Sequence, residues 1–356
     1  MYNIPQMTEQ TGKNMNDGLA HRVVVVVLLV FLSAGCAQLR EFLGPSTPGE
    51  WTALLKEIRA FERRIGFVDT GNFTGLSKEQ HAFPVCGYAS RLTLPYSYQD
   101  PAIQWLDVET ERECLTRGRD GDVYFGTVEA WGEVGTPATP AMIGGKLNRF
   151  IYLVIHEDCH DQFDLPYGIE EALCDLITHK GMVVFAGEKY ELNGREGRAI
   201  RDYAETQSGI ARATITYYEQ LAALYARYQR NEISPDVLQQ ERSAIFMNAR
   251  TPLGWARGEF NNVRIANSMT YSRHYPFLES VFVALGSDLA RTVAFFKQVD
   301  KIKPSGAAVM RQRRIAREDS VEYLRAYEAA LVETISKALT DATTAQSPGR
   351  AALPPL

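Results

Sequence analysis

The segment VIHEDCHDQFDLPYGIEEALCDLI, residues 154–177, carries the most informative pattern in this chain. Two His residues stand four positions apart at the end of an apolar run. Residues at that spacing lie on nearly the same face of an α-helix, because about 3.6 residues complete one turn. The sequence therefore predicts a helix over residues 148–160 that is buried along its apolar part and presents His156 and His160 together.

The stretch HEDCH, residues 156–160, has the H-E-x-x-H arrangement of zinc metallopeptidases. Zinc accepts neutral imidazole nitrogens at about 2.0–2.1 Å, and a neighbouring carboxylate can take a proton from the attacking water. We therefore expect His156 and His160 to bind zinc and Glu157 to act as general base. Asp158 departs from the motif, in which this position is usually apolar, and we expect it to face water or a cation.

A second helix carries the other candidate ligands. It is predicted to begin after a Pro-Gly turn and to end at Gly181. Catalytic zinc needs a third protein ligand, and EEALCD resembles the thermolysin-type pattern Asn-Glu-Ala-x-x-Asp. This resemblance implies that Glu171 is the third ligand and that Asp175 orients His156, as carboxylates usually do for ligating imidazoles. Glu170 replaces the Asn of that pattern and is the rival ligand, and a solvated acidic helix face is the alternative to both.

Composition and texture indicate the fold class. The chain has 356 residues, 45% hydrophobic and 23% charged, with a formal net charge of -5. These values are typical of a globular protein, and no basic stripe indicates a nucleic-acid partner. We predict an α+β fold with one catalytic domain at residues 51–338, divided into a sheet-containing part, 51–147, and a larger, mainly helical part, 148–338. Residues 339–356 are predicted to be a disordered tail.

The N-terminal segment predicts export. Arg22 precedes an unbroken apolar run. The run is shorter than a membrane-spanning helix, which needs about 20 residues. The run ends in LSAGC, which resembles a lipobox. This implies a lipoprotein signal peptide at residues 1–36, lipidation of Cys36, and a tether at 37–50. We expect a lipid-anchored protein of the cell envelope that faces the periplasm from the outer membrane. An uncleaved anchor or plain secretion is the alternative.

Four further Cys residues are Cys86, Cys114, Cys159 and Cys174. An exported protein can form disulfides, but four Cys allow three connectivities and the sequence does not choose among them. Cys159 lies in the first motif and Cys174 in the second, so the two thiols are close if the two helices pack together. Buried free Cys is the alternative.

Over about residues 50–300 the chain resembles a bacterial aminopeptidase family, zinc metallopeptidase-like lipoproteins of the gluzincin type. Four stretches in the same order carry this resemblance: FPVCGYASRLTLPY; DVYFGTVEAWGEVG; HEDCH with EEALCD; and FNNVRIANSMTYSRHYPFLESVFVALGSDLARTVAFFKQV. The resemblance implies a zincin-like metallopeptidase fold, Zn²⁺ as cofactor and a peptide substrate. Asp158 and the short spacer between the two motifs are the departures from the family pattern.

The resemblance also implies roles outside the metal motifs. A strand upstream of the metal helix lines the cleft in zincins, and GTVEAWGEVG alternates like an edge strand. Glu129 and Glu133 are candidates for binding the α-amine of the substrate, although surface carboxylates are common. Tyr271 is the first candidate for a catalytic donor to the developing oxyanion, ahead of His274 and Tyr275. Core packing is the alternative for these aromatic side chains.

Three classes of function follow from these patterns. The first is a zinc-dependent aminopeptidase acting on peptides. The second is a catalytically impaired envelope lipoprotein that binds zinc or no metal, which Asp158 favours. The third is a zinc amidase acting on cell-wall material, because the motif fixes the attack chemistry and not the substrate.

Overall fold

The computed structural model describes residues 45–78, 82–130, 135–144, 146–191, 193–254 and 260–345. The predicted signal peptide with Cys36, the candidate Glu133 and the end of the predicted tail from residue 346 lie outside these residues. Within the described ranges, no helix combines the length and the apolar character that crossing a bilayer requires.

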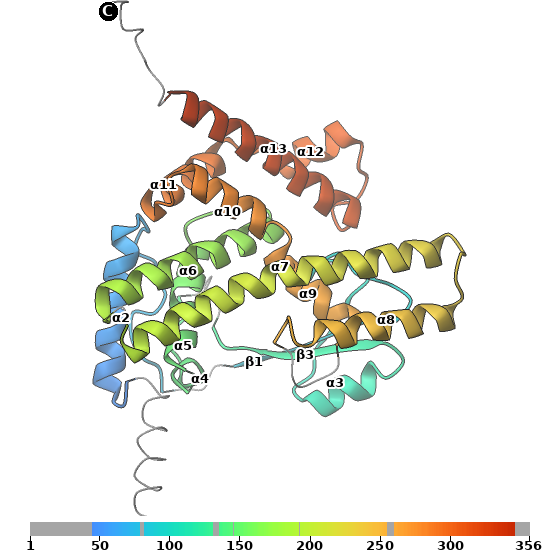
Figure 1. The fold of residues 1–356 in the computed structure, drawn as a ribbon, viewed down its shortest axis with the longest axis horizontal. Helices are drawn as coiled ribbons and strands as arrows, with labels where there is room; N and C mark the ends of the chain where they lie inside the picture. The colour runs from blue at the N-terminus through green and yellow to red at the C-terminus, as the bar shows by residue number, and fades with distance from the viewer. Residues whose placement is uncertain are drawn as a thin grey trace, which may run out of the picture. The chain divides into compact units, whose positions relative to one another are not determined.

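Helices dominate the described chain, and three short strands form one small sheet (Figure 1). The strands are β1 Phe83–Ala89, β2 Gln104–Leu106 and β3 Asp122–Val128. The helices are α2 Pro48–Arg64, α3 Glu111–Arg117, α4 Pro140–Ile143, α5 Leu147–His160, α6 Tyr167–Lys189, α7 Arg195–Gln229, α8 Pro235–Ala249, α9 Asn262–Ser272, α10 Tyr275–Ala284, α11 Leu289–Ile302, α12 Gly306–Arg313 and α13 Val321–Ala345. This mixture of helix and sheet confirms the predicted α+β class.

The sheet has the order β2-β1-β3, and both strand pairs are antiparallel. In this register Gly87 of β1 lies opposite Trp105 of β2 on one side and Tyr124 of β3 on the other. Helix α9 packs against β1 and β3. Because β3 is an edge strand of the described sheet, it leaves one row of backbone groups unpaired by a neighbouring strand.

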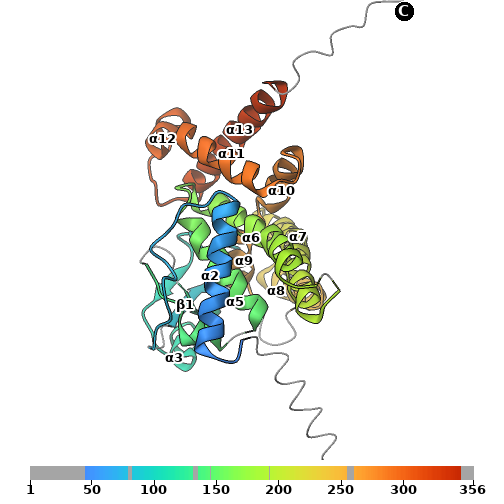
Figure 2. The same cartoon turned by 90° about the vertical axis from the view of Figure 1, so that its left-hand side faces the viewer.

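The two helices of the histidine and acidic motifs lie side by side in the main core. Helix α5 buries Phe150, Ile151, Val154 and Ile155 completely, as its apolar run predicts. Helix α2 packs against α5 (Figure 2), and it begins with a capping box in which the Thr47 side chain and Glu50 satisfy each other's backbone N–H groups. The core therefore fixes both motif helices over most of their length.

The predicted end of α6 at Gly181 is wrong. The helix continues without interruption to Lys189. A Cβ atom at position 181 would lie 3.3 Å from Cε1 of Phe61, which is tighter than ordinary contact. Gly181 therefore allows α2 and α6 to approach closely, and this packing outweighs the helix-ending preference of glycine.

The predicted start of the disordered tail at residue 339 is also wrong. Helix α13 continues to Ala345. Leu331 and Ile335 of this helix are fully buried, and Leu339 packs against the same core. Apolar contacts on this face extend the helix into residues whose polar composition alone suggested disorder.

Candidate metal centre

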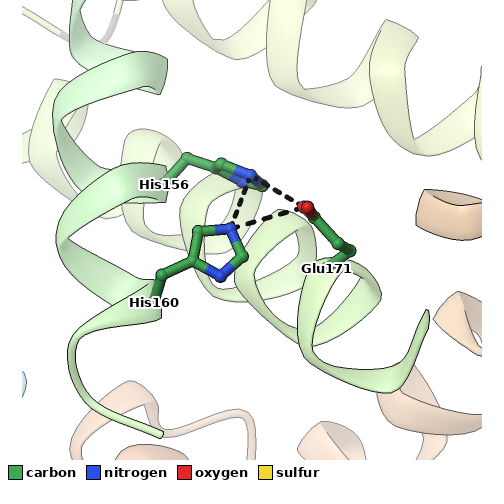
Figure 3. Close-up of side chains that lie close together, drawn as sticks. All are labelled: His156, His160 and Glu171. Carbon is green, nitrogen blue, oxygen red and sulfur yellow. Dashed lines mark hydrogen bonds and ion pairs between the residues drawn. The ribbon is translucent and has the colours of Figure 1, made fainter. Parts of the chain in front are cut away.

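Three donor atoms meet between α5 and α6, from His156, His160 and Glu171 (Figure 3). Nε2 of His156 lies 3.2 Å from Oε2 of Glu171 and 3.3 Å from Nε2 of His160. The third side of the triangle, from Nε2 of His160 to Oε2 of Glu171, is 3.4 Å. The spacing of four residues on α5 brings the two imidazoles together, and α6 supplies the carboxylate from the facing helix.

These separations fit a zinc ion. When each bond is about 2.0–2.1 Å, neighbouring ligands of a tetrahedral zinc lie about 3.3–3.4 Å apart. All three sides of the observed triangle agree with that edge within about 0.2 Å. Two imidazole nitrogens and one carboxylate oxygen are also the donor set of a catalytic zinc that keeps a fourth position for water. The residues present therefore fit Zn²⁺.

Each imidazole has a carboxylate at its other ring nitrogen. Oδ1 of Asp175 lies 3.3 Å from Nδ1 of His156, close enough for a charge contact but outside hydrogen-bond geometry. Oε1 of Glu170 lies 2.9 Å from Nδ1 of His160 and forms a hydrogen bond. Tyr152 donates to Oδ1 of Asp175 at 2.6 Å. Glu170 is thus placed behind His160, and Glu171 is the acidic residue whose oxygen joins the triad.

The same carboxylates control the protonation of the imidazoles. Burial opposes a charge on His156, but the carboxylates of Asp175 and Glu171 outweigh it and raise its pKa to about 9. Burial likewise opposes a charge on His160, and Glu170 and Glu171 raise its pKa to about 11. A cation must displace these protons, so the affinity for zinc is expected to rise with pH.

A cavity of about 360 Å³ lies beside the triad. Helix α5 contributes Glu157 and His160 to its lining, α6 contributes Glu171, and α9 contributes Tyr271. The candidate base therefore shares a cavity with two of the candidate ligands. The predicted cleft strand also contributes, because Val128 of β3 lines the cavity.

Of the three candidate oxyanion donors, Tyr271 is the one that lines the cavity. Its ring centroid lies 6.3 Å from that of His156. Burial and the charge of Glu171 raise the pKa of Tyr271 well above its ordinary value, so the phenol keeps its proton and can donate. His274 instead pairs with Glu328, and the fully buried Tyr275 bonds to Ser208.

The candidate amine ligand Glu129 is engaged elsewhere. Its Oε2 lies 2.7 Å from Nη2 of Arg149 and accepts a second bond from Nε of that residue at 2.8 Å. Glu129 is not among the described residues that line the cavity. The structure therefore does not bring Glu129 to the triad, and Glu133 lies outside the described residues.

Two disulfides are present among the described residues, Cys86–Cys114 and Cys159–Cys174. The second joins α5 to α6, in agreement with the expectation that the two thiols are close if these helices pack together. Cys159 precedes His160, and Cys174 precedes Asp175. The cross-link closes a loop with a sequence separation of 15, which by loop entropy stabilises the fold by about 3 kcal/mol.

Of the two predicted surroundings of Asp158, water and a cation, the structure excludes water. Asp158 is 2% exposed, and its Oδ1 accepts a hydrogen bond from Thr70 at 2.6 Å. Its second partner is the buried Glu62 of α2. Arg59 is the nearby cation, which agrees with the other predicted surrounding of Asp158. Burial first, and then the charge of Asp158, raise the pKa of Glu62 well above its ordinary value. The neutral form of Glu62 is therefore favoured beside Asp158, on the α2 side of the helix.

Replacing Glu62 by Gln is expected to stabilise the protein at alkaline pH. Because the folded pKa of Glu62 is raised, its contribution to stability is complete below the unfolded value near 4.5 and is lost as pH rises through the folded pKa. The amide introduced by Glu62→Gln has no acidic proton to lose. The variant should exceed the wild type by on the order of 1 kcal/mol at pH 9 and by less at pH 5. Thermal unfolding from pH 5 to pH 9 measures this, with the exposed change Glu57→Gln as control. A stability difference that does not grow with pH would contradict a raised pKa of Glu62 in the folded protein.

Replacing Asp175 by Asn is expected to weaken zinc binding by about 10–100-fold, because the imidazole of His156 loses its orienting charge. Competition against a chromophoric chelator measures the affinity. Asp202→Asn, an exposed change on α7, is the matched control and should bind zinc as the wild type does. Wild-type affinity in the Asp175 variant would show that the contact at 3.3 Å does not support the ligand.

Several residues of the site were not identified from the sequence as contributors. Tyr152 lies one turn before His156 on α5, and its ring stacks on that imidazole with centroids 5.0 Å apart. Tyr98 and Tyr167 line the cavity. A helical spacing of four residues could have indicated Tyr152, whereas Tyr98 comes from a loop that no local pattern connects to the metal helices.

Comparison of the chain with protein-family models, with curated proteins and with solved structures finds no match.

Proposed function

We propose that this protein is a zinc-dependent peptidase with a zincin-like catalytic domain, and that it acts as an aminopeptidase. The observation that supports the proposal most strongly is the triangle of donor atoms from His156, His160 and Glu171, with sides of 3.2–3.4 Å. The carboxylate behind each imidazole adds support, since ligating His residues usually have such partners. The same proposal includes export to the cell envelope and a lipid anchor at Cys36.

Each residue of the candidate site has a role in the proposed hydrolysis. Bound zinc would polarise the peptide carbonyl and lower the pKa of water toward about 7. Glu157 would take the proton from the attacking water and pass it to the leaving amine. Tyr271 would donate a hydrogen bond to the carbonyl oxygen as negative charge develops on it. Asp175 and Glu170 would hold the two imidazoles in the tautomer that presents Nε2 to the metal.

The environment of Asp158 favours this proposal over an impaired enzyme. Asp158 was the reason to consider an inactive protein, but its side chain is committed to Thr70 and Glu62. It therefore does not compete for the metal or for the cavity.

Metal analysis and peptide hydrolysis test the proposal together. Residues 37–356 should bind one zinc per chain, and His160→Ala should bind none under the same conditions. The zinc form should hydrolyse a tripeptide with a free amine and leave its N-acetylated form intact. Hydrolysis of both the free and the N-acetylated peptide would support a peptidase but contradict the assignment as an aminopeptidase. No zinc after reconstitution would overturn the proposal, and turnover confined to cell-wall amides would replace the peptidase by an amidase.

A further inference from the structure

The sheet presents a row of aromatic side chains on one face. Gly87 lies between Trp105 and Tyr124 in the register of the sheet, and directly opposite residues of an antiparallel pair point to the same face. Val85 shares that face because side chains alternate along a strand. Val85 and Tyr124 line the cavity beside the triad, so Trp105 stands on the cavity side of the sheet.

Glycines make room for these rings. A Cβ atom at Gly87 would lie 2.7 Å from Cζ3 of Trp105, and one at Gly126 would lie 2.5 Å from Oη of Tyr124. Both separations are too short for any other residue without displacement of the ring. The indole of Trp105 therefore lies across β1, and the phenol of Tyr124 lies along its own strand.

The aromatic side chains lead from solvent to the metal ligands. Trp105 is 36% exposed although it is a large apolar residue. Its ring packs against the ring of Tyr98, with centroids 4.2 Å apart. The ring centroids of Tyr98 and Tyr167 are 6.1 Å apart. Tyr167 and the ligand candidate Glu171 line the same cavity, and burial followed by the nearby charge of Glu171 raises the pKa of Tyr167 above its ordinary value. We call Trp105, Tyr98 and Tyr167 the aromatic wall.

A hydrogen bond to α9 holds the middle residue of the aromatic wall in place. The backbone N–H of Tyr98 donates to Oγ1 of Thr270 on α9 at 2.9 Å. Val85, Val128 and Ala130 are apolar residues in the lining of the same cavity. Aromatic rings and small aliphatic groups in one cavity lining provide apolar surface against which an aromatic ring can stack.

We propose that Trp105 and Tyr98 bind the aromatic or large aliphatic side chain of a peptide substrate in the residue next to the cleaved bond. This inference rests on the proposed peptidase function, because it takes the substrate to be a peptide. The aromatic wall would then determine which peptide side chains are preferred, because it extends from the solvent-exposed Trp105 to Tyr167, beside the candidate ligand Glu171.

Binding measurements without turnover test the aromatic wall. The zinc form of Glu157→Gln is titrated by calorimetry with Ala-Phe-Ala and with Ala-Ala-Ala. We expect about tenfold tighter binding of the Phe peptide, because a stacked ring adds buried area and a favourable aromatic contact. Adding Trp105→Ala should bring the ratio of the two affinities close to one, and Trp105→Phe should restore most of the preference.

The control is Tyr88→Ala, because Tyr88 is an aromatic residue of β1 on the opposite face of the sheet. It should keep the preference for Phe. Equal affinities for the two peptides, no binding of either, or the same preference in Trp105→Ala would each overturn the proposal. Tighter, Trp105-dependent binding of an N-acetylglucosamine trimer would assign the wall to a glycan instead.

Turnover by the chain with Glu157 intact separates this inference from the proposed function. Selective binding without hydrolysis of either peptide would keep the aromatic wall and refute the peptidase. Hydrolysis of both peptides at equal kcat/KM, without selective binding, would keep the peptidase and refute the aromatic wall.

Discussion

Glu157→Gln is expected to keep its zinc and to lower kcat for a peptide substrate by about 10²–10⁴-fold, the usual contribution of a general base. Gln has nearly the shape of Glu but cannot accept the proton of the attacking water. Glu157 is not part of the donor triangle, so the metal should remain bound. Initial rates and metal content, measured on the same preparation, give both quantities.

The control for this prediction is Glu219→Gln, an exposed change on α7 that removes the same charge far along the sequence from both motifs. It should retain full turnover. Wild-type turnover in Glu157→Gln would remove Glu157 from the mechanism. Loss of zinc together with activity would mean that the change damages the metal centre and would leave another group to serve as base.

Glu171→Ala is expected to weaken zinc binding by about a thousandfold. A structural zinc site with four protein ligands binds with about 10–16 kcal/mol, so one ligand contributes up to roughly 4 kcal/mol if the contributions are similar. Glu170→Ala, the adjacent change, should cost only about 10–100-fold, because Glu170 contacts Nδ1 of His160 and not the donor triangle.

The comparison of these neighbours decides between two carboxylates that the sequence could not separate. Dissociation constants from competition with a chelator, at fixed pH, measure both variants. The pH must be fixed because the raised pKa values of His156 and His160 make zinc affinity depend on it. A larger loss in Glu170→Ala than in Glu171→Ala would make Glu170 the ligand.

The part of the site that could be predicted from the sequence depends on helix periodicity. His156 and His160 meet because they are four apart on one helix, and the apolar run before them fixes which side of that helix is buried. Glu171 and Asp175 follow the same rule on α6. Periodicity places side chains on a face, and the family resemblance supplied the expectation that the two faces oppose each other.

Contacts between distant segments could not be predicted in this way. Asp158 is buried against Glu62 and Thr70, and both of these residues come from far upstream in the chain. The same limit explains the error at Gly181, where a residue that usually ends helices is used for close packing on Phe61. Trp105 stands on the cavity side of the sheet because of the strand register, which depends on strand pairing that no short pattern determines.

The Cys159–Cys174 bond keeps the ligand residues of the candidate metal site close together before any ion binds. Its two ends stand directly before His160 and Asp175, so the covalent link holds together the helices that share the donor atoms. The entropy of gathering the donors is then lost when the chain folds and oxidises, and not when the ion arrives. If the triad binds zinc as proposed, the ion would leave and return without separation of the helices, and the metal-free protein would stay folded and ready to bind zinc again.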